Sequence, residues 1–186
     1  QWDEIDRLNA ELAPFVIFKG IESDILADGS LDYPDELLEG FDLVISSIHS
    51  GFNMSEAQAT ERLVRAACHP ATSILGHPTG RLLLKRAGYP IDHKAVIDAC
   101  AAHGTAIELN CNPYRMDLDW TWIEYAQSCG VPIAINPDAH RIYELGYLHE
   151  GVLIAKRGGL LRAHTLNAKS TDELRNWLRG EPMPFA

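Results

Sequence analysis

The stretch DLVISSI at residues 42–48 is a short, mostly apolar run that ends directly before a histidine. A run of this length is too brief for a helix and is typical of a strand. The chain contains four more such runs, bounded by glycine or proline, at residues 15–20, 73–76, 105–109 and 132–136. We interpret all five runs as buried strands of a parallel sheet.

Helical segments separate most of these strands. Ser55 is followed three residues later by Gln58, which is a capping-box signal for the start of a helix. Asp92 opens a second segment of helical period, and residues 117–119 precede a third. Another helix is expected before the first strand, from Asp3 to Leu12. Repeated strand-helix units predict an α/β fold with a parallel sheet.

Length and composition indicate one globular domain over residues 1–186. The chain is 46% apolar, which is enough to bury a single core. No apolar run reaches the roughly 20 residues of a membrane helix, and no secretion signal precedes the first helix. We therefore expect a cytoplasmic protein without a membrane partner. The net charge of −10 disfavours binding of nucleic acid through a broad basic surface.

Polar residues follow the predicted strands. In barrels of repeated β-α units, reactive groups collect at the carboxyl ends of the strands, because the loops converge there. Histidine nitrogen and carboxylate oxygen are the usual ligands of zinc, manganese and iron. Asp138 and His140 are two residues apart, so both face one cavity if the segment is extended. The candidate residues at the strand ends are Glu22, His49, His77, Asn110, Asp138 and His140.

Several motifs, in this order along the chain, resemble the polymerase-and-histidinol-phosphatase (PHP) superfamily. They are GIESDI at 20–25, SSIHS at 46–50, GHP at 76–78, ELN at 108–110 and DAH at 138–140. A narrower set is similar to the C-terminal PHP domain of bacterial and archaeal family X DNA polymerases. It comprises LDYP at 31–34, HPTGRLL at 77–83, RAGY at 86–89 and YRMDL at 114–118. The resemblance covers about residues 15–168.

The resemblance implies a distorted, TIM-like (β/α)7 barrel that holds up to three divalent metal ions, manganese or zinc. About five β/α units are present, so we expect an N-terminally truncated barrel. Glu22 would bridge two metals, and Glu22 and Asp138 would be the catalytic carboxylates. The implied metal ligands are Glu22, His49, His77, Asp138 and His140.

The resemblance also implies that further ligands lie upstream of Gln1, in a His-x-His motif on the first strand, a histidine after it and an Asp-His on the second strand. With incomplete ligand shells, this chain alone is expected to bind metal weakly and to hydrolyse little. Pro137 departs from the family, which more often has serine or threonine before the aspartate. It is expected to stiffen the loop.

The implied activity is metal-dependent phosphodiester hydrolysis, namely 3′–5′ exonuclease cleavage in DNA repair or proofreading. The implied partners are a DNA 3′ end and a polymerase domain in the same parent chain. Two other functions stay open. The acidic charge favours a phosphomonoesterase like histidinol phosphatase, and the third hypothesis is a non-catalytic structural PHP module. Five ligand-competent side chains at the strand ends favour an enzyme over that module.

Three arginines near the predicted strand ends, Arg81, Arg86 and Arg115, are candidate phosphate contacts. We predict substrate binding by Arg81 and Arg115. The alternative is a solvated surface position or a structural ion pair, for which Asp117 is the obvious partner of Arg115. Glu108, two residues before Asn110, is expected either to orient a ligand histidine or to be structural.

Overall fold

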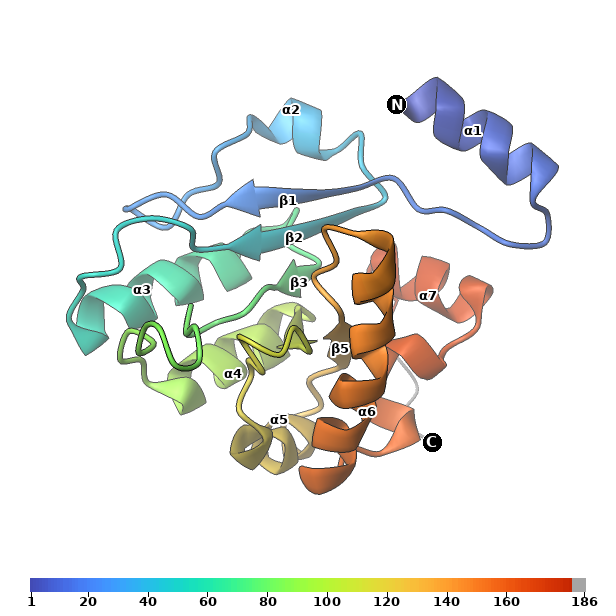
Figure 1. Cartoon of the computed structure of the whole chain (residues 1–186). Helices are drawn as coiled ribbons and strands as arrows, with labels where there is room; N and C mark the ends of the chain where they lie inside the picture. The colour runs from blue at the N-terminus through green and yellow to red at the C-terminus, as the bar shows by residue number, and fades with distance from the viewer. Residues whose placement is uncertain (182–186) are drawn as a thin grey trace.

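A parallel sheet of five strands forms the centre of the computed structural model, which describes residues 1–181 (Figure 1). The strands lie in the order β1-β2-β3-β4-β5, so each strand pairs with the next one along the chain. All four pairings are parallel, and the carboxyl ends of the strands therefore lie at one edge of the sheet. The strands are β1 Gly20–Asp24, β2 Leu43–Ser47, β3 Ile74–Leu75, β4 Ala106–Asn110 and β5 Ile133–Asn136.

Helices fill the connections between the strands. The predicted capping box of Ser55 and Gln58 starts α3, and the side chain of Asp92 caps α4. At the third expected start, the side chain of Asp119 caps a 3-10 turn that leads into α5. The α-helices are α1 Trp2–Glu11, α2 Asp35–Leu38, α3 Glu56–Ala67, α4 His93–His103, α5 Ile123–Ser128, α6 Leu148–Arg157 and α7 Thr171–Leu178. The 3-10 helices are η1 Trp120–Trp122, η2 Ile142–Tyr147, η3 Arg162–His164 and η4 Leu166–Ala168.

The two faces of the sheet are packed differently. Since side chains alternate along a strand, each strand contributes to both faces. One face carries residues such as Val44 and Ile107, which belong to a large core with α3, α4, α5 and α6. The other face carries Ile74 and Ala134, which form a smaller core against which Trp177 of α7 packs. Burial on both faces explains why β2, β3, β4 and β5 consist mainly of short apolar runs.

Four predicted strands are confirmed to within one residue at each end, but the first prediction is wrong. Residues 15–19 of the expected strand are not part of the sheet, and β1 begins at Gly20, the last residue of the prediction. Phe15 is exposed, and the main chain of Ile17 bonds the side-chain amide of Asn9 at 2.7 and 2.9 Å rather than a neighbouring strand. As a result, Glu22 lies in the middle of β1 and not beyond its end.

Within residues 1–181 the sheet is open, with β1 and β5 at its two edges. The predicted α/β class with a parallel sheet is confirmed, whereas a closed barrel is not seen in this part of the chain. At the β5 edge, the side chain of Asn167 accepts from Ile135 N–H at 2.8 Å and donates to its carbonyl at 2.9 Å. This amide occupies the place of a neighbouring strand along one residue of β5.

Helix α1 lies at the periphery beyond β1 and is linked to it by an extended segment (Figure 1). Trp2 packs edge-to-face on Phe41 with ring centroids 5.2 Å apart, and Lys19 pairs with Asp6 at 2.7 Å. None of the α1 residues is buried. Across residues 1–181, we find no helix that combines the length and the apolar character needed to cross a membrane.

Gly151 allows α6 to approach the ends of β4 and β5 closely. A Cβ atom at this position would lie 2.6 Å from both Cys111 Cβ and Ile135 Cγ2. We expect Gly151→Ala to lower the free energy of unfolding by about 1–3 kcal/mol, because the methyl group overpacks a rigid contact. Gly146 is the matched control, since a Cβ there meets no atom within 4 Å. Urea denaturation measures both variants, and equal midpoints would contradict the close approach.

Candidate metal site

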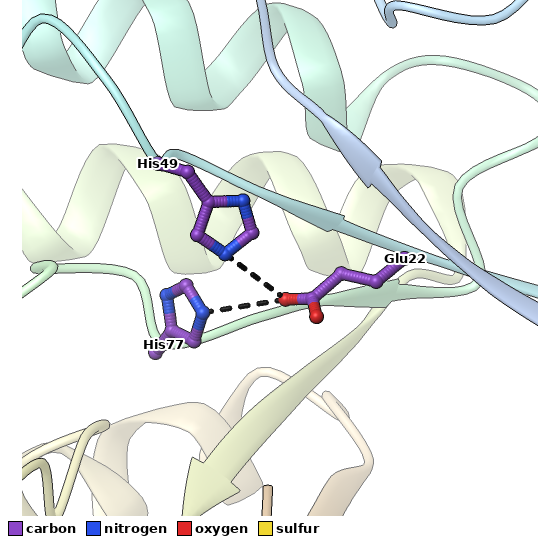
Figure 2. Close-up of side chains that lie close together, drawn as sticks. All are labelled: Glu22, His49 and His77. Carbon is purple, nitrogen blue, oxygen red and sulfur yellow. Dashed lines mark ion pairs between the residues drawn. The ribbon is translucent and has the colours of Figure 1, made fainter. Parts of the chain in front are cut away.

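Glu22, His49 and His77 converge at the carboxyl edge of the sheet (Figure 2). Oε1 of Glu22 lies 3.4 Å from Nε2 of His49 and 3.3 Å from Nε2 of His77. The two imidazole rings contact each other edge-to-face, with centroids 5.1 Å apart. One ligand atom from each of the three side chains lies within 4.8 Å of the other two.

Three neighbouring strands place this cluster. Glu22 belongs to β1, His49 follows β2 by two residues, and His77 follows β3 by two residues. Glu22 is in register with Ile45 of β2, and Ile45 packs against the smaller core, so Glu22 lies on the same face of the sheet. Figure 2 shows its side chain reaching from the strand toward both rings.

Glu22 and His49 each favour the charged form of the other. Hydrogen bonding to His49, and next to His77, holds the pKa of Glu22 well below its usual range. The Glu22 carboxylate, with Asp24 adding to it, raises the pKa of His49 to about 9 against the opposing effect of burial. Glu22 is therefore an anion at neutral pH, and His49 has to release a proton before its nitrogen lone pair can bind a cation.

The donor set fits a divalent transition metal. Two imidazole nitrogens and one carboxylate oxygen are the ligand types that zinc and manganese sites use. His77 is buried, and its Nδ1 has no hydrogen-bond partner within residues 1–181, so Nε2 is the ring nitrogen that faces the cluster. Three converging ligands leave room for further ligands or a substrate atom around the same ion.

The structure does not bring Asp138 and His140 into this cluster. Oδ2 of Asp138 accepts a hydrogen bond from Arg115 Nε at 3.0 Å and another from Asn110 Nδ2 at 3.1 Å. The side chain of His140 is 80% exposed, and its Nδ1 lies 3.0 Å from the main-chain oxygen of Asp138. Asp138 has a positive φ of 51°, a conformation that is uncommon outside glycine and tends to occur at functional sites. The roles of both residues as metal ligands stay predictions.

Glu108 hydrogen-bonds groups that belong to, or follow, three neighbouring strands of the site. Its carboxyl group is buried, and burial raises its pKa above the usual range. Oε2 accepts from the backbone N–H of His77 at 2.7 Å and from Asn110 Nδ2 at 3.2 Å, while Oε1 accepts from Asn136 Nδ2 at 3.0 Å. Glu108 therefore fixes the main chain of His77 and not its ring, which refines the predicted orienting role.

The candidate phosphate contacts are largely occupied by protein groups. Arg81 bonds Asp119 at 2.9 Å and the main-chain oxygens of Arg115 and Met116. Arg86 donates twice to the carbonyl of Gly80. Arg115 does form an ion pair, but its partner is Asp138. The alternative partner, Asp117, is fully buried and accepts from Thr79 instead. Substrate binding by Arg81 and Arg115 stays a prediction.

Sequence reasoning missed two residues that hold the loops of the cluster. Asp24 contacts Nδ1 of His49 at 2.5 Å. Arg62 of α3 is buried and donates to the carbonyls of Ile25, Leu26 and Ser50. These carbonyls lie in the loops after β1 and β2. The position of Asp24 two residues after Glu22 on a strand was a usable signal, because both side chains then share a face.

Other hollows of the described chain lie away from this cluster. One of them, of about 640 Å³, is lined by residues such as His103, Pro132 and Trp177. It lies at the opposite end of the strands, because Pro132 precedes β5 and His103 ends the helix before β4. It brings together no group of three or more metal-binding side chains within residues 1–181. Within residues 1–181, the group of three metal-binding side chains therefore lies at the carboxyl edge of the sheet and not at this hollow.

Known proteins resemble most of this chain. It is 44% identical to the DNA polymerase/3′-5′ exonuclease PolX of Bacillus subtilis over 179 residues. These residues make up 96% of this chain and 31% of that protein. It is 41% identical over 137 residues to a protein named as a probable phosphatase in Syntrophotalea carbinolica, 67% of this chain and 53% of that protein.

A third relative is named as a probable phosphatase in Thermoanaerobacter sp. strain X514. The identity is 30% over 161 residues, 81% of this chain and 63% of that protein. The chain thus spans about a third of the polymerase and less than two thirds of either phosphatase. No protein-family model matches the chain.

Proposed function

Because the chain belongs to the PHP superfamily, we propose that residues 1–186 are a metal-dependent phosphoesterase domain that cleaves phosphodiester bonds at DNA 3′ ends. The 44% identity to a polymerase with 3′-5′ exonuclease in its name supports this substrate over 96% of the chain. We further propose that the five strands are part of a PHP-type barrel. The polymerase domain and the DNA would be partners in the parent protein.

The convergence of Glu22, His49 and His77 carries the proposal. Sequence resemblance implied that these three residues are metal ligands, and the fold brings their ligand atoms within 4.8 Å of one another. A bound divalent ion supplies positive charge for the phosphate and makes a water molecule a better nucleophile near neutral pH. The acidic chain needs this charge, since its net charge of −10 would otherwise repel a phosphodiester.

Each residue has a separate part in this proposal. Glu22 contributes an anionic oxygen between the two histidines, and Glu108 holds the backbone of His77 in place. Asp138 and His140 join as ligands of further ions. Arg115 and Asn110 both donate to Oδ2 of Asp138, so Oδ1 would be the oxygen available to hold an ion. Arg115, which is held beside Asp138, would be placed to contact a phosphate bound there, because a guanidinium group suits a phosphate.

Hydrolysis of a small phosphomonoester is the second candidate. Two observations favour it, namely the relatives named as probable phosphatases and the acidic charge of the chain. The same cluster would bind the ion in both cases. The difference lies in the substrate, because a DNA strand needs additional basic surface that another domain of the parent protein can supply.

Hydrolysis assays separate the two candidates. We would incubate the chain, and a version extended upstream in its parent gene, with manganese and a single-stranded DNA labelled at its 3′ end. The expected result is metal-dependent release of 3′ nucleotides by the extended version, lost in its His77→Ala variant, and little or no release by the chain alone. Hydrolysis of p-nitrophenyl phosphate without DNA cleavage would favour the phosphatase. Absence of both activities in both versions, despite bound metal, would favour the non-catalytic module.

A further inference from the structure

We propose that Asp24 is a positioning residue for His49, whose carboxylate fixes the imidazole so that Nε2 faces the candidate metal position. The inference rests on the proposed function, because it assigns a task to a residue next to the proposed ligands. Asp24 would not bind the ion itself. It would act through His49, by holding the ring nitrogen on the side away from Glu22.

The two ring nitrogens of His49 are divided between two carboxylates. Nδ1 lies 2.5 Å from Oδ1 of Asp24, and Nε2 lies 3.4 Å from Oε1 of Glu22. When the ring carries one proton, Asp24 favours the tautomer with that proton on Nδ1. Nε2 then keeps a free lone pair that points at Glu22 and His77. Metal-binding histidines in proteins usually donate their second N–H to such an acceptor.

Strand geometry makes this arrangement possible. Glu22 and Asp24 are two residues apart on β1, so both side chains point to the same face of the sheet. Asp24 is in register with Ser47 of β2, and His49 follows Ser47 by two residues. The histidine therefore lies just beyond Asp24 along the strand direction. One ring can reach both carboxylates.

Backbone hydrogen bonds hold the main chain of Asp24 in place. Its N–H donates to Oδ1 of Asp32 at 2.9 Å, and the next residue, Ile25, donates to the Ser47 carbonyl at 2.8 Å. The guanidinium group of Arg62 bonds the carbonyl of Ile25 and, on the other loop, the carbonyl of Ser50. These contacts lock the backbones on either side of the Asp24–His49 pair. The Asp24 carboxylate therefore extends from a fixed backbone and can orient the His49 ring.

Exposure argues against a purely structural task for Asp24. Its side chain is 44% exposed, and that of His49 is 37% exposed. Contacts between charged groups at this level of exposure contribute little to folding stability. A short and directed contact that contributes little stability is explained by orientation. His77 offers a contrast, because the chain buries it and needs no carboxylate to restrict its ring.

The test compares Asp24→Asn and Asp24→Ala with a matched control, Asp35→Asn. Asp35 also pairs with a histidine, since its Oδ1 lies 3.3 Å from Nε2 of His69, but α2 places it outside the cluster. Cobalt(II) is the probe, because its visible absorption reports ligand geometry. We expect both Asp24 variants to weaken cobalt binding by about 10–100-fold. Asp35→Asn should stay within about twofold of the unchanged chain, with all thermal midpoints alike.

A second readout does not depend on affinity. Nitrogen-15 spectra of the histidine rings in the zinc-loaded chain should show the proton of His49 on Nδ1. This signal should exchange with solvent faster in Asp24→Asn. If a variant fails to fold, the unchanged chain still decides, because a zinc-loaded His49 without a proton on Nδ1 overturns the proposal.

His49→Ala separates this inference from the proposed function. If His49→Ala weakens cobalt binding and the Asp24 variants do not, the positioning role is wrong and the metal site stands. If cobalt binding is the same in His49→Ala, Glu22→Gln and the unchanged chain, the cluster is not a metal site and both proposals fail.

Discussion

Glu22→Gln is expected to remove metal binding more completely than any single histidine substitution. The amide keeps the shape of the side chain but loses the negative charge, and Glu22 is the only anion in the cluster of three. Its Oε1 also lies within 3.4 Å of both Nε2 atoms, so one substitution disturbs both neighbours. Changes in residues that merely orient ligands cost about 10–100-fold in affinity. We expect Glu22→Gln to cost more than about 100-fold.

Isothermal titration with manganese or zinc measures this effect. His49→Ala and His77→Ala should each lose less affinity than Glu22→Gln. Glu4→Gln is the control, because Glu4 is an exposed glutamate of α1, far from the sheet edge in sequence and structure. A Glu22→Gln protein that binds metal as tightly as Glu4→Gln would show that the cluster is not where the ion binds.

Arg62→Leu should cause the largest loss of stability among the substitutions considered. Arg62 is buried, and its guanidinium group donates to the carbonyls of Ile25, Leu26 and Ser50. Leucine fills part of the volume but leaves three carbonyl groups without these donors. The bond to the Ile25 carbonyl is buried and the other two are part-buried. A buried polar group that loses its partner costs about 1–3 kcal/mol, and such costs are not additive. We expect a total loss of about 3–5 kcal/mol in the free energy of unfolding.

Arg65→Leu on the same helix is the matched control. Arg65 is exposed and pairs with Glu61 at 2.6 Å, four residues away. Such exposed pairs contribute about 1 kcal/mol or less. Urea denaturation of both variants gives the comparison, and similar midpoints would contradict the stabilising role of the Arg62 hydrogen bonds. Since these bonds hold the loops that follow Asp24 and His49, Arg62→Leu should also weaken metal binding at temperatures where it remains folded.

Much of the fold was predictable because buried parallel strands leave a clear pattern in the sequence. Four apolar runs became strands at nearly the expected positions, and the capping residues Ser55 and Asp92 started the expected helices. The first strand was misplaced because residues 15–18 are apolar without being paired. By contrast, β1 is mostly polar, with Glu22 and Asp24 on the face of the site and the buried Ser23 between them. The polar side chains of Glu22 and Asp24 therefore made β1 difficult to recognise as a buried strand.

The candidate site was only partly predictable. Family motifs indicated which side chains could bind metal, and the fold confirms that Glu22, His49 and His77 lie together. The sequence did not indicate that Asp138 bonds Arg115, because such a contact depends on how separate loops meet. The task of Arg62 was hidden for a similar reason. Its neighbours Glu61 and Arg65 are charged, so the sequence suggests a solvated helix face.

Every functional assignment above requires that Glu22, His49 and His77 bind the same divalent ion. Anomalous diffraction from zinc-soaked crystals, recorded above and below the zinc absorption edge, locates the ion directly. We predict a peak about 2.0–2.2 Å from the Glu22 carboxylate and from Nε2 of both histidines. A zinc peak bound elsewhere, with these three side chains still bonded only to one another, would contradict the claim.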